Sequence, residues 1–159
     1  MPDKWFKIRF WLVKKGEKDL NFTSNTWQSV LPENWEDRSM ITLVGTTGAS
    51  GIASNIVVTH QKISPDVSIE DFAQYQREAI EQEIPDVDVL EERSFTLNGS
   101  PAFQRLQQFA YENQSIRQVQ TFILGGGYIY VITGTSASED FDASIGAFKE
   151  FTDNFRLSK

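Results

Sequence analysis

Three long segments rich in β-branched and aromatic residues follow one another with only three residues between them. They span 102–111, 115–124 and 128–135, with links Glu112-Asn113-Gln114 and Gly125-Gly126-Gly127. Strands joined by such short links must be antiparallel, because a parallel return needs a crossover of about a dozen residues or more. Asn98-Gly99, a dipeptide typical of two-residue hairpin turns, connects a further extended segment to them. This run predicts an antiparallel sheet and constrains the fold more than any other feature.

Two helical segments accompany the predicted strands. Apolar residues recur every three or four positions between Ser68 and Pro85, and a second such pattern covers 139–155. Ser68 is a preferred N-cap residue with Asp71 three positions on, and Pro85 ends the first helix. Further extended segments are predicted at 5–13, 27–31, 40–44, 55–62, 87–92 and 95–97. These elements predict an α+β fold in which a twisted antiparallel sheet is flanked by two main amphipathic helices.

Charge is unevenly distributed along the chain. The net charge is −7, yet residues 1–19 carry six Lys or Arg against three Asp or Glu. The acidic remainder repels phosphate backbones, so we expect no nucleic acid partner for the domain. The absence of cysteine excludes disulfides and thiolate metal sites, and no apolar run reaches the roughly 18 residues of a membrane span. With no signal-peptide core at the start, a cytoplasmic location is expected.

Three features have the residue types of a catalytic or ligand-binding site. In each case an ordinary structural role explains the residues better than such a site does. His60 lies in an alternating strand, and no G-x-S-x-G pattern accompanies it. Gly45–Gly51 is glycine-rich, but a β segment follows it where a phosphate loop needs a helix N-terminus, so a flexible loop is expected. Glu91 and Glu92 alternate onto opposite faces of a strand and cannot converge on a metal. We therefore predict no catalytic, cofactor or metal site and no enzyme.

Cations and aromatic rings alternate in residues 4–13. The pattern suits a charged edge strand that resists unwanted pairing, which is the interpretation we favour. It also suits docking to a protein partner, to anionic lipid or to single-stranded nucleic acid, so membrane contact through residues 4–13 is kept as an alternative. We divide the chain here into a basic aromatic N-terminal strand extension, residues 1–20, and an α+β domain, residues 21–159.

Glutamines are concentrated on the two longest predicted strands. Alternation places Gln107 and Gln108 on opposite faces of the first strand, and it places Gln118 and Gln120 on the same face as Phe122 in the next. Uncharged amides among large apolar groups can bond a partner's backbone while the apolar groups bury its side chains. A partner-binding face and an ordinary solvated face both remain open at this point.

The stretch Leu31-Pro-Glu-Asn-Trp-Glu-Asp-Arg-Ser39-Met40 resembles the Leu-Pro-x-x-Trp-x-Asp-x-Ser opening of DcrB-like domains, which belong to the PsbP-like fold group. The resemblance continues through the helix with Phe72 and Tyr75, the Asn98-Gly99 hairpin, the strand at 117–122 and the final helix. It covers about residues 22–158 and implies the same α+β fold. Within the family, the chain is closest in character to the Eag-type effector chaperones of type VI secretion.

The Eag-type resemblance implies a protein-binding site on the sheet. Members of that branch are small cytoplasmic homodimers that shield the apolar N-terminal helices of a secreted toxin. Met40 and Thr42 match positions that contact the client helix there, and Gln120 matches a glutamine. Thr42 departs from the aliphatic residue usual in the branch, and residues 1–20 are an addition that could cover the site. The predicted partner-binding residues are Met40, Thr42, Gln118, Gln120 and Phe122.

Two functions follow as hypotheses. The first is a homodimeric, non-enzymatic adaptor or chaperone that binds an apolar helical segment of a client protein on its sheet face. The alternative is a peripheral membrane or complex-assembly factor that acts through the basic aromatic N-terminal strand. The fold group also contains exported or lipidated proteins and a factor that grips a small GTPase, and no residue of this chain selects either.

Overall fold

The computed structural model describes residues 21–23 and 28–158. The predicted strand at 5–13, and with it the extension over residues 1–20, lies outside the described residues. The elements are β1 (Asn21–Thr23), β2 (Gln28–Val30), β3 (Met40–Thr47), β4 (Ala53–Lys62), α1 (Ile69–Glu83), β5 (Asp88–Leu97), β6 (Ser100–Tyr111), β7 (Gln114–Gly125), β8 (Tyr128–Ala137), the 3-10 turn η1 (Ser138–Asp140) and α2 (Phe141–Asp153).

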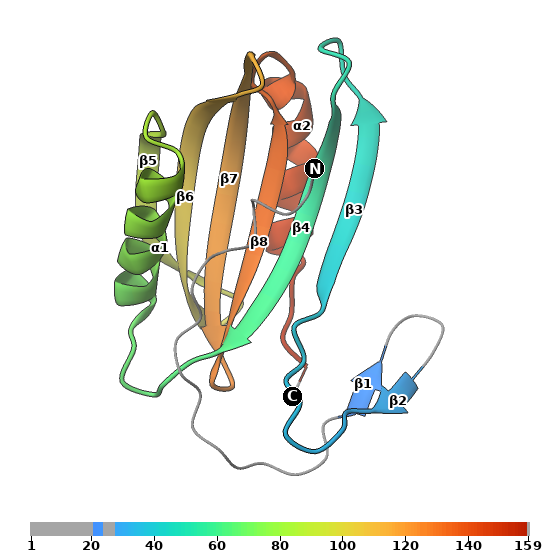
Figure 1. Ribbon diagram of the computed structural model, residues 1–159, viewed down its shortest axis with the longest axis vertical. Coiled ribbons are helices and arrows are strands. Elements are labelled where there is room, and N and C mark those ends of the chain that lie inside the picture. Colours follow the sequence, from blue (N-terminus) through green and yellow to red (C-terminus); the bar gives the residue numbers. More distant parts are fainter. Residues whose placement is uncertain (1–20, 24–27, 159) are drawn as a thin grey trace.

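Strands β3 to β8 form one antiparallel sheet of six strands in the order β3-β4-β8-β7-β6-β5 (Figure 1). β5 to β8 form a meander, and the β3–β4 hairpin joins it through β4 and β8, which pair from Lys62↔Tyr128 to Asn55↔Thr135. β1 and β2 pair only with each other. The α+β fold and the antiparallel run of long strands predicted from the sequence are confirmed.

The hairpin turns use residues that tolerate left-handed backbone conformations. Asn98 and Gly99 both have positive φ values, 50° and 89°, as the two central residues of a hairpin turn require. The β6–β7 turn uses Glu112 and Asn113, with φ of 47° and 67°. Glutamate is uncommon at positive φ. The ten residue pairs between β6 and β7 stabilise the hairpin and compensate for this unfavourable conformation.

Helix α1 begins at the predicted cap. The Asp71 amide donates to Ser68 Oγ over 3.1 Å, and the Asp71 carboxylate accepts from the Ser68 amide over 3.4 Å. The buried side of the helix packs on one face of the sheet, named here the α1 face, where the cluster contains Ile69, Phe72, Ala73, Phe122 and Ile129. The rings of Phe72 and Phe122 meet edge to face with centroids 5.7 Å apart.

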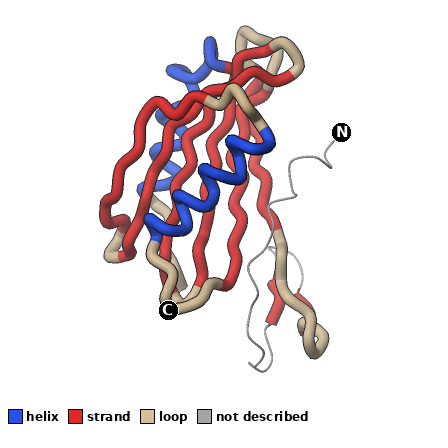
Figure 2. The backbone as a smooth tube through the Cα atoms, turned by 60° about the vertical axis from the view of Figure 1, so that its left-hand side comes forward, coloured by secondary structure: helices blue, strands red, loops and turns tan. Residues whose placement is uncertain are grey.

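Helix α2 packs on the opposite face of the sheet, named here the α2 face (Figure 2). Its Phe148 ring lies on Gly134 of β8, where an added Cβ would come within 2.6 Å of the ring. The second core cluster lies on this side and contains Leu97, Ala102, Ile123 and Ile132, with Phe151 and Phe155 packed against it. Neighbouring residues therefore serve different clusters, as Phe122 and Ile123 do, and the central strands are apolar on both faces.

Two segments differ from the sequence-based expectation. β3 continues past a bulge to Thr47, so the flexible loop expected at Gly45–Gly51 is reduced to a turn closed by the bond from the Gly48 amide to the Ile52 carbonyl (3.0 Å). β5 is one strand with a bulge between Val89 and Glu91, rather than two separate extended pieces. A bulge breaks the strict alternation on which the strand predictions depend.

Candidate functional site

The five residues predicted to bind a partner all lie on the α1 face. Two rows of directly paired residues cross the sheet and contain four of them: Phe122–Val131–Thr59–Met40 and Gln120–Thr133–Val57–Thr42. Gln118 lies in the next row and pairs with Thr135. The antiparallel register thus brings residues from β3 and β7, more than 70 positions apart in the chain, onto one surface.

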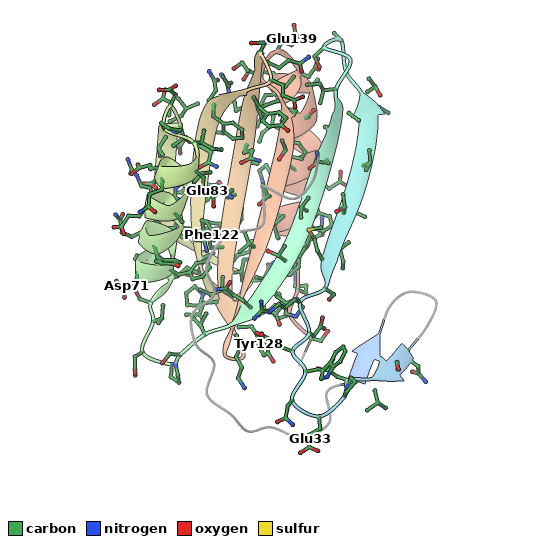
Figure 3. The ribbon with its side chains drawn as sticks, in the orientation of Figure 1. Glu33, Asp71, Glu83, Phe122, Tyr128 and Glu139 are labelled. Carbon is green, nitrogen blue, oxygen red and sulfur yellow. The ribbon has the colours of Figure 1, made fainter. Side chains whose placement is uncertain are left out.

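The accessibility of these residues differs. Met40 is 45% exposed and Thr42 is also exposed, because β3 is the outermost strand. Gln120 is half-buried. Phe122 is 1% exposed under α1 and offers no surface to a partner while the helix is docked. Figure 3 shows Phe122 beside α1.

The two neighbouring glutamines of β7 differ in their hydrogen bonding. Gln118 is held in a ladder, since its Oε1 accepts from Gln107 Nε2 and its Nε2 donates to Thr135 Oγ1, both over 3.0 Å. Gln107 is fully buried, and its Oε1 has no hydrogen-bond partner within the described residues. Gln120 makes no side-chain hydrogen bond with any residue that the structure describes. Of the two predicted amides on β7, Gln120 is the one that is available to a partner.

Helix coverage divides the α1 face into two parts. α1 packs over β6 and β7, and within the described residues no helix lies over this face of β8, β4 and β3 (Figure 1). The name open half is used here for Met40, Thr42, Val57 and Thr133 on these strands, together with Gln120 on the adjoining part of β7. It carries aliphatic and hydroxyl groups with one free amide and no charged side chain. A surface of this composition suits an apolar partner segment that carries a few polar groups.

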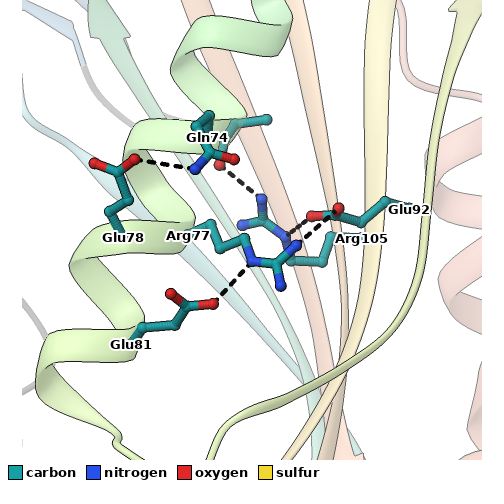
Figure 4. A network of polar contacts seen from close by, with 7 residues as sticks. Gln74, Arg77, Glu78, Glu81, Glu92 and Arg105 are labelled. Carbon is teal, nitrogen blue, oxygen red and sulfur yellow. Dashed lines mark hydrogen bonds and ion pairs between the residues drawn. The ribbon is translucent and has the colours of Figure 1, made fainter.

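Arg105 is a buried, charged side chain beside the candidate site that the sequence analysis did not single out. It is 1% exposed on the α1 face, where its Nε donates to Glu92 Oε1 over 2.7 Å and its Nη2 to the Ala73 carbonyl over 2.6 Å (Figure 4). Glu92 also accepts from Arg77 of α1 over 3.2 Å. The guanidinium lies 5.7 Å from the centre of the Phe122 ring. Glu92 is therefore a partly exposed partner of a buried cation that fastens α1.

A sequence profile of the family described as DcrB matches residues 29–152. The chain belongs to the DcrB family. The match covers β2 to α2, so the DcrB-family domain comprises the complete six-stranded sheet and both helices. No curated protein is a match in sequence.

Three solved structures share the fold of this DcrB-family chain. A Pseudomonas aeruginosa protein of unknown function, PA94, is 16% identical with a TM-score of 0.80, covering 90% of this chain and 99% of PA94. CyanoP, the PsbP of Synechocystis sp. PCC 6803, is 11% identical with a TM-score of 0.57, over 88% and 92% of the chains. LpqN of Mycobacterium tuberculosis, involved in cell envelope biogenesis, is 10% identical with a TM-score of 0.54, over 77% and 85%. These similarities place the fold in the PsbP-like group.

The histidine of the DcrB-family domain lies in an aromatic cluster on the α2 face. The His60 ring stacks on Tyr130 with centroids 6.0 Å apart and tilts against Tyr128 at 5.9 Å. Its Nε2 lies 3.8 Å from Asp37 Oδ2, beyond hydrogen-bond range. Burial, with a smaller contribution from Tyr128, raises the pKa of Tyr130 above its ordinary value, so this phenol stays neutral. These ring contacts join β4 to β8. His60 is therefore a packing residue of a strand, as the sequence predicts.

The glycine-rich turn does hold an anion, namely the carboxylate of Asp140 from the same chain. Asp140 accepts hydrogen bonds from the amides of Ala49 (3.0 Å) and Ser50 (3.2 Å) and from Ser50 Oγ. Gly48 permits this approach, because a Cβ there would lie 2.2 Å from the carboxylate. The clasp ties the β3–β4 turn to the start of α2.

The clasp gives an expected pH dependence. The hydroxyl of Ser50, and then the backbone amides, hold the pKa of Asp140 below its ordinary value. A lowered folded pKa contributes stability above the unfolded pKa of about 3.9, and that contribution is lost as pH falls through the folded value. Measured by hydrogen exchange, protection of the Ala49 and Ser50 amides, corrected for intrinsic exchange, should fall below about pH 4. In Asp140→Asn, protection should be lower at neutral pH and should show no such step; an unchanged profile would contradict the clasp.

The described residues form neither a metal-ligand cluster nor a helix that could span a membrane. Among residues 21–23 and 28–158, no three His, Asp or Glu side chains are placed to share a metal ion. Of the helices described, neither is long and apolar enough to cross a membrane. The expectations of no enzyme, no cofactor and no nucleic acid partner remain predictions.

Proposed function

We propose that this DcrB-family domain is a non-enzymatic adaptor or chaperone that holds an apolar helical segment of a client protein on the open half of its α1 face. The observation that carries the proposal is Gln120, a half-buried amide without a side-chain hydrogen bond in the described part of the chain, at the border between the open half and α1. An amide that a partner covers without bonding to it costs about 1–3 kcal/mol, so this position favours an occupant that bonds to the amide. The resemblance to Eag-type chaperones of secreted effectors also supports a client-binding role.

Binding on this surface would combine two contributions. Aliphatic groups such as Met40 and Val57 would bury the apolar side chains of the client helix, at about 25 cal/mol for each Å² removed from water. Gln120 and the hydroxyls of Thr42 and Thr133 would bond to small polar groups or exposed backbone of that helix. The contacts replace those that the segment makes in its final environment, and they are weak enough individually to be released.

The test uses a fluorescently labelled, uncharged helical peptide of about 20 Leu, Ala and Ser residues as the client probe, in mild detergent. Anisotropy should show saturable binding to the wild-type protein. Thr133→Arg should weaken it at least tenfold, because a cation would enter the centre of the open half. Gln120→Arg should do the same, but the new cation lies directly opposite Arg105, so its melting temperature must be checked. Thr133 has no charged residue beside it in the register and is the cleaner variant.

The matched control is Gln82→Arg, an equal change of charge at an exposed position of α1. It should leave binding unchanged. Peptide binding that survives Thr133→Arg in a folded protein would show that the open half is not the site.

A cytoplasmic homodimer serving a secretion system remains part of the proposal.

The alternative function is contact with a membrane through residues 4–13. Cosedimentation with phosphatidylserine–phosphatidylcholine vesicles should be weak for the wild-type protein if the chaperone proposal is correct. Strong sedimentation that disappears in a full-length Lys7→Glu, Arg9→Glu variant, together with no peptide binding, would favour the alternative.

A further inference from the structure

A cleft lies on the α2 face, between helix α2 and the strands β5 and β6. α2 crosses this face over β7 and β8 (Figure 2), and the cleft opens along its other side. Its volume is about 370 Å³, at the lower end of the range of about 300–1,000 Å³ for small-molecule sites. The apolar part of its lining includes Phe95, Leu106, Val119, Ile145 and Phe148. The open half lies on the opposite face of the sheet, so the cleft is a separate feature.

Four charged side chains line the cleft, and two of them are paired with each other. Lys149 and Asp153 form an ion pair one turn apart on α2. Glu91 and Arg93 are exposed on β5, and neither has an ion pair with any residue that the structure describes. The cleft therefore carries one anion and one cation that are both free to meet the charges of a ligand.

Neutral groups hold Arg93 in place. Its Nε and Nη2 donate to Gln104 Oε1 over 3.1 and 2.8 Å, and its guanidinium lies 5.1 Å from the centre of the Phe95 ring. Gln104 is fixed in turn, because its Nε2 donates to Thr121 Oγ1 over 3.0 Å and Thr121 is 1% exposed. The outer edge of the guanidinium, formed by Nη1 and Nη2, is left for a carboxylate, which it can bind in a bidentate manner.

A buried hydroxyl also lines the cleft. Thr152 of α2 is 8% exposed, and its side chain has no hydrogen bond within the described part of the chain. A ligand that covers this hydroxyl without bonding to it would incur a cost in free energy. The position therefore favours a ligand with a polar group between its charged ends, such as a peptide bond.

We propose that this cleft binds a zwitterionic dipeptide with an apolar side chain, its ammonium group at Glu91 and its carboxylate at Arg93. The spacing of the two charges selects the length. Glu91 and Arg93 are two residues apart on one face of β5, so their Cα atoms are about 7 Å apart. An extended dipeptide is also about 7 Å long. A single amino acid is about half that length, and a longer peptide places its two charges farther apart.

The direction of the side chains sets the composition of the ligand. Successive side chains of an extended chain point to opposite sides, so one side chain of the dipeptide enters the cleft and the other faces solvent. The entering side chain meets Ile145 and Phe148, and a leucine or phenylalanine suits this apolar surface. This inference does not rest on the proposed function.

The first test follows the backbone amide NMR signals of the ¹⁵N-labelled full chain during titration with L-leucyl-L-leucine at neutral pH. The titration extends to about 10 mM, because a ligand of this size gains limited binding energy. Saturable shifts should be confined to β5, β6 and the side of α2 that lines the cleft. Arg93→Gln and Glu91→Gln should each weaken binding about tenfold, with an unchanged circular dichroism spectrum because both side chains are exposed.

The matched controls are Arg38→Gln and Glu83→Gln. They remove the same charges at exposed positions that do not line the cleft, and they should leave the affinity unchanged. A titration without saturable shifts, shifts confined to other parts of the chain, or an unchanged affinity in Arg93→Gln would overturn the proposal.

The second test assigns each charge of the ligand to its partner. N-acetyl-leucyl-leucine lacks the ammonium group, and leucyl-leucinamide lacks the carboxylate. Acetylation should weaken binding to the wild-type protein about tenfold and should have little effect in Glu91→Gln, where the same interaction is already lost. Amidation should show the same relation with Arg93→Gln. Equal affinities of the wild-type protein for the acetylated and the free dipeptide would overturn the zwitterion and identify the ligand as an amphipathic carboxylate.

The two proposals fail separately, because the cleft and the open half lie on opposite faces. Thr133→Arg should lose the helical peptide and keep the dipeptide, and Arg93→Gln should do the reverse. Dipeptide binding by a protein that does not bind the helical peptide would support the cleft and remove the proposed function.

Discussion

Replacing Glu92 with alanine should lower the free energy of unfolding by about 3 kcal/mol, measured by urea denaturation followed by circular dichroism. The change leaves Arg105 buried with only the Ala73 carbonyl as a described acceptor. A buried charge that loses its counter-ion usually costs about 3–5 kcal/mol. The Glu92 side chain is 29% exposed, so water can reach the vacated position and the lower end of that range is expected.

Two control variants separate this effect from ordinary loss of contacts. Arg105→Met removes the charge and keeps most of the volume, so it should cost less than Glu92→Ala, about 1 kcal/mol. Glu81→Ala breaks only the exposed pair with Arg77 and should change stability by no more than about 0.5 kcal/mol. Equal effects of Glu92→Ala and Glu81→Ala would mean that Arg105 does not depend on Glu92.

Gly134→Val should be comparably damaging, with an expected loss of about 2–3 kcal/mol in the same urea experiment. Strand propensity alone favours valine over glycine in β8. The structure predicts the opposite sign, because the Cβ would enter the space of the Phe148 ring and displace α2.

The control for Gly134 is Gly146→Ala in the middle of α2. A Cβ at Gly146 meets no atom within 4 Å, so alanine should raise stability by up to about 1 kcal/mol through helix propensity. A tolerated Gly134→Val would mean that α2 packs less closely on β8 than the structure shows.

The long strands could be predicted from the sequence because their signals are local. Asn98-Gly99 and the three-glycine link specify turns directly, and Ser68, Asp71 and Pro85 specify both ends of α1. Alternation also placed Gln118, Gln120 and Phe122 on one face correctly, since a strand repeats every two residues wherever no bulge intervenes.

The contacts that complete the site are not local. Arg105 meets a carboxylate in β5 and a carbonyl in α1, and neither position is marked by spacing in the sequence. Asp140 binds a turn some 90 residues earlier, so a glycine-rich segment that reads as flexible becomes fixed. The burial of Phe122 depends on where α1 docks, and alternation cannot decide which stretch of a strand a helix covers.

The strand order has a consequence for the protein while it is being synthesised. β4 ends at Lys62, but β8, the strand on which it docks, begins only at Tyr128. At a translation rate of about 5–20 residues per second, the β3–β4 hairpin emerges several seconds before its place in the sheet exists. During that interval its apolar residues on both sides have no native cover from the sheet. The nascent chain is therefore most exposed to misassociation between neighbouring ribosomes at this hairpin, and the amino-terminal third is where cellular folding factors would be needed first.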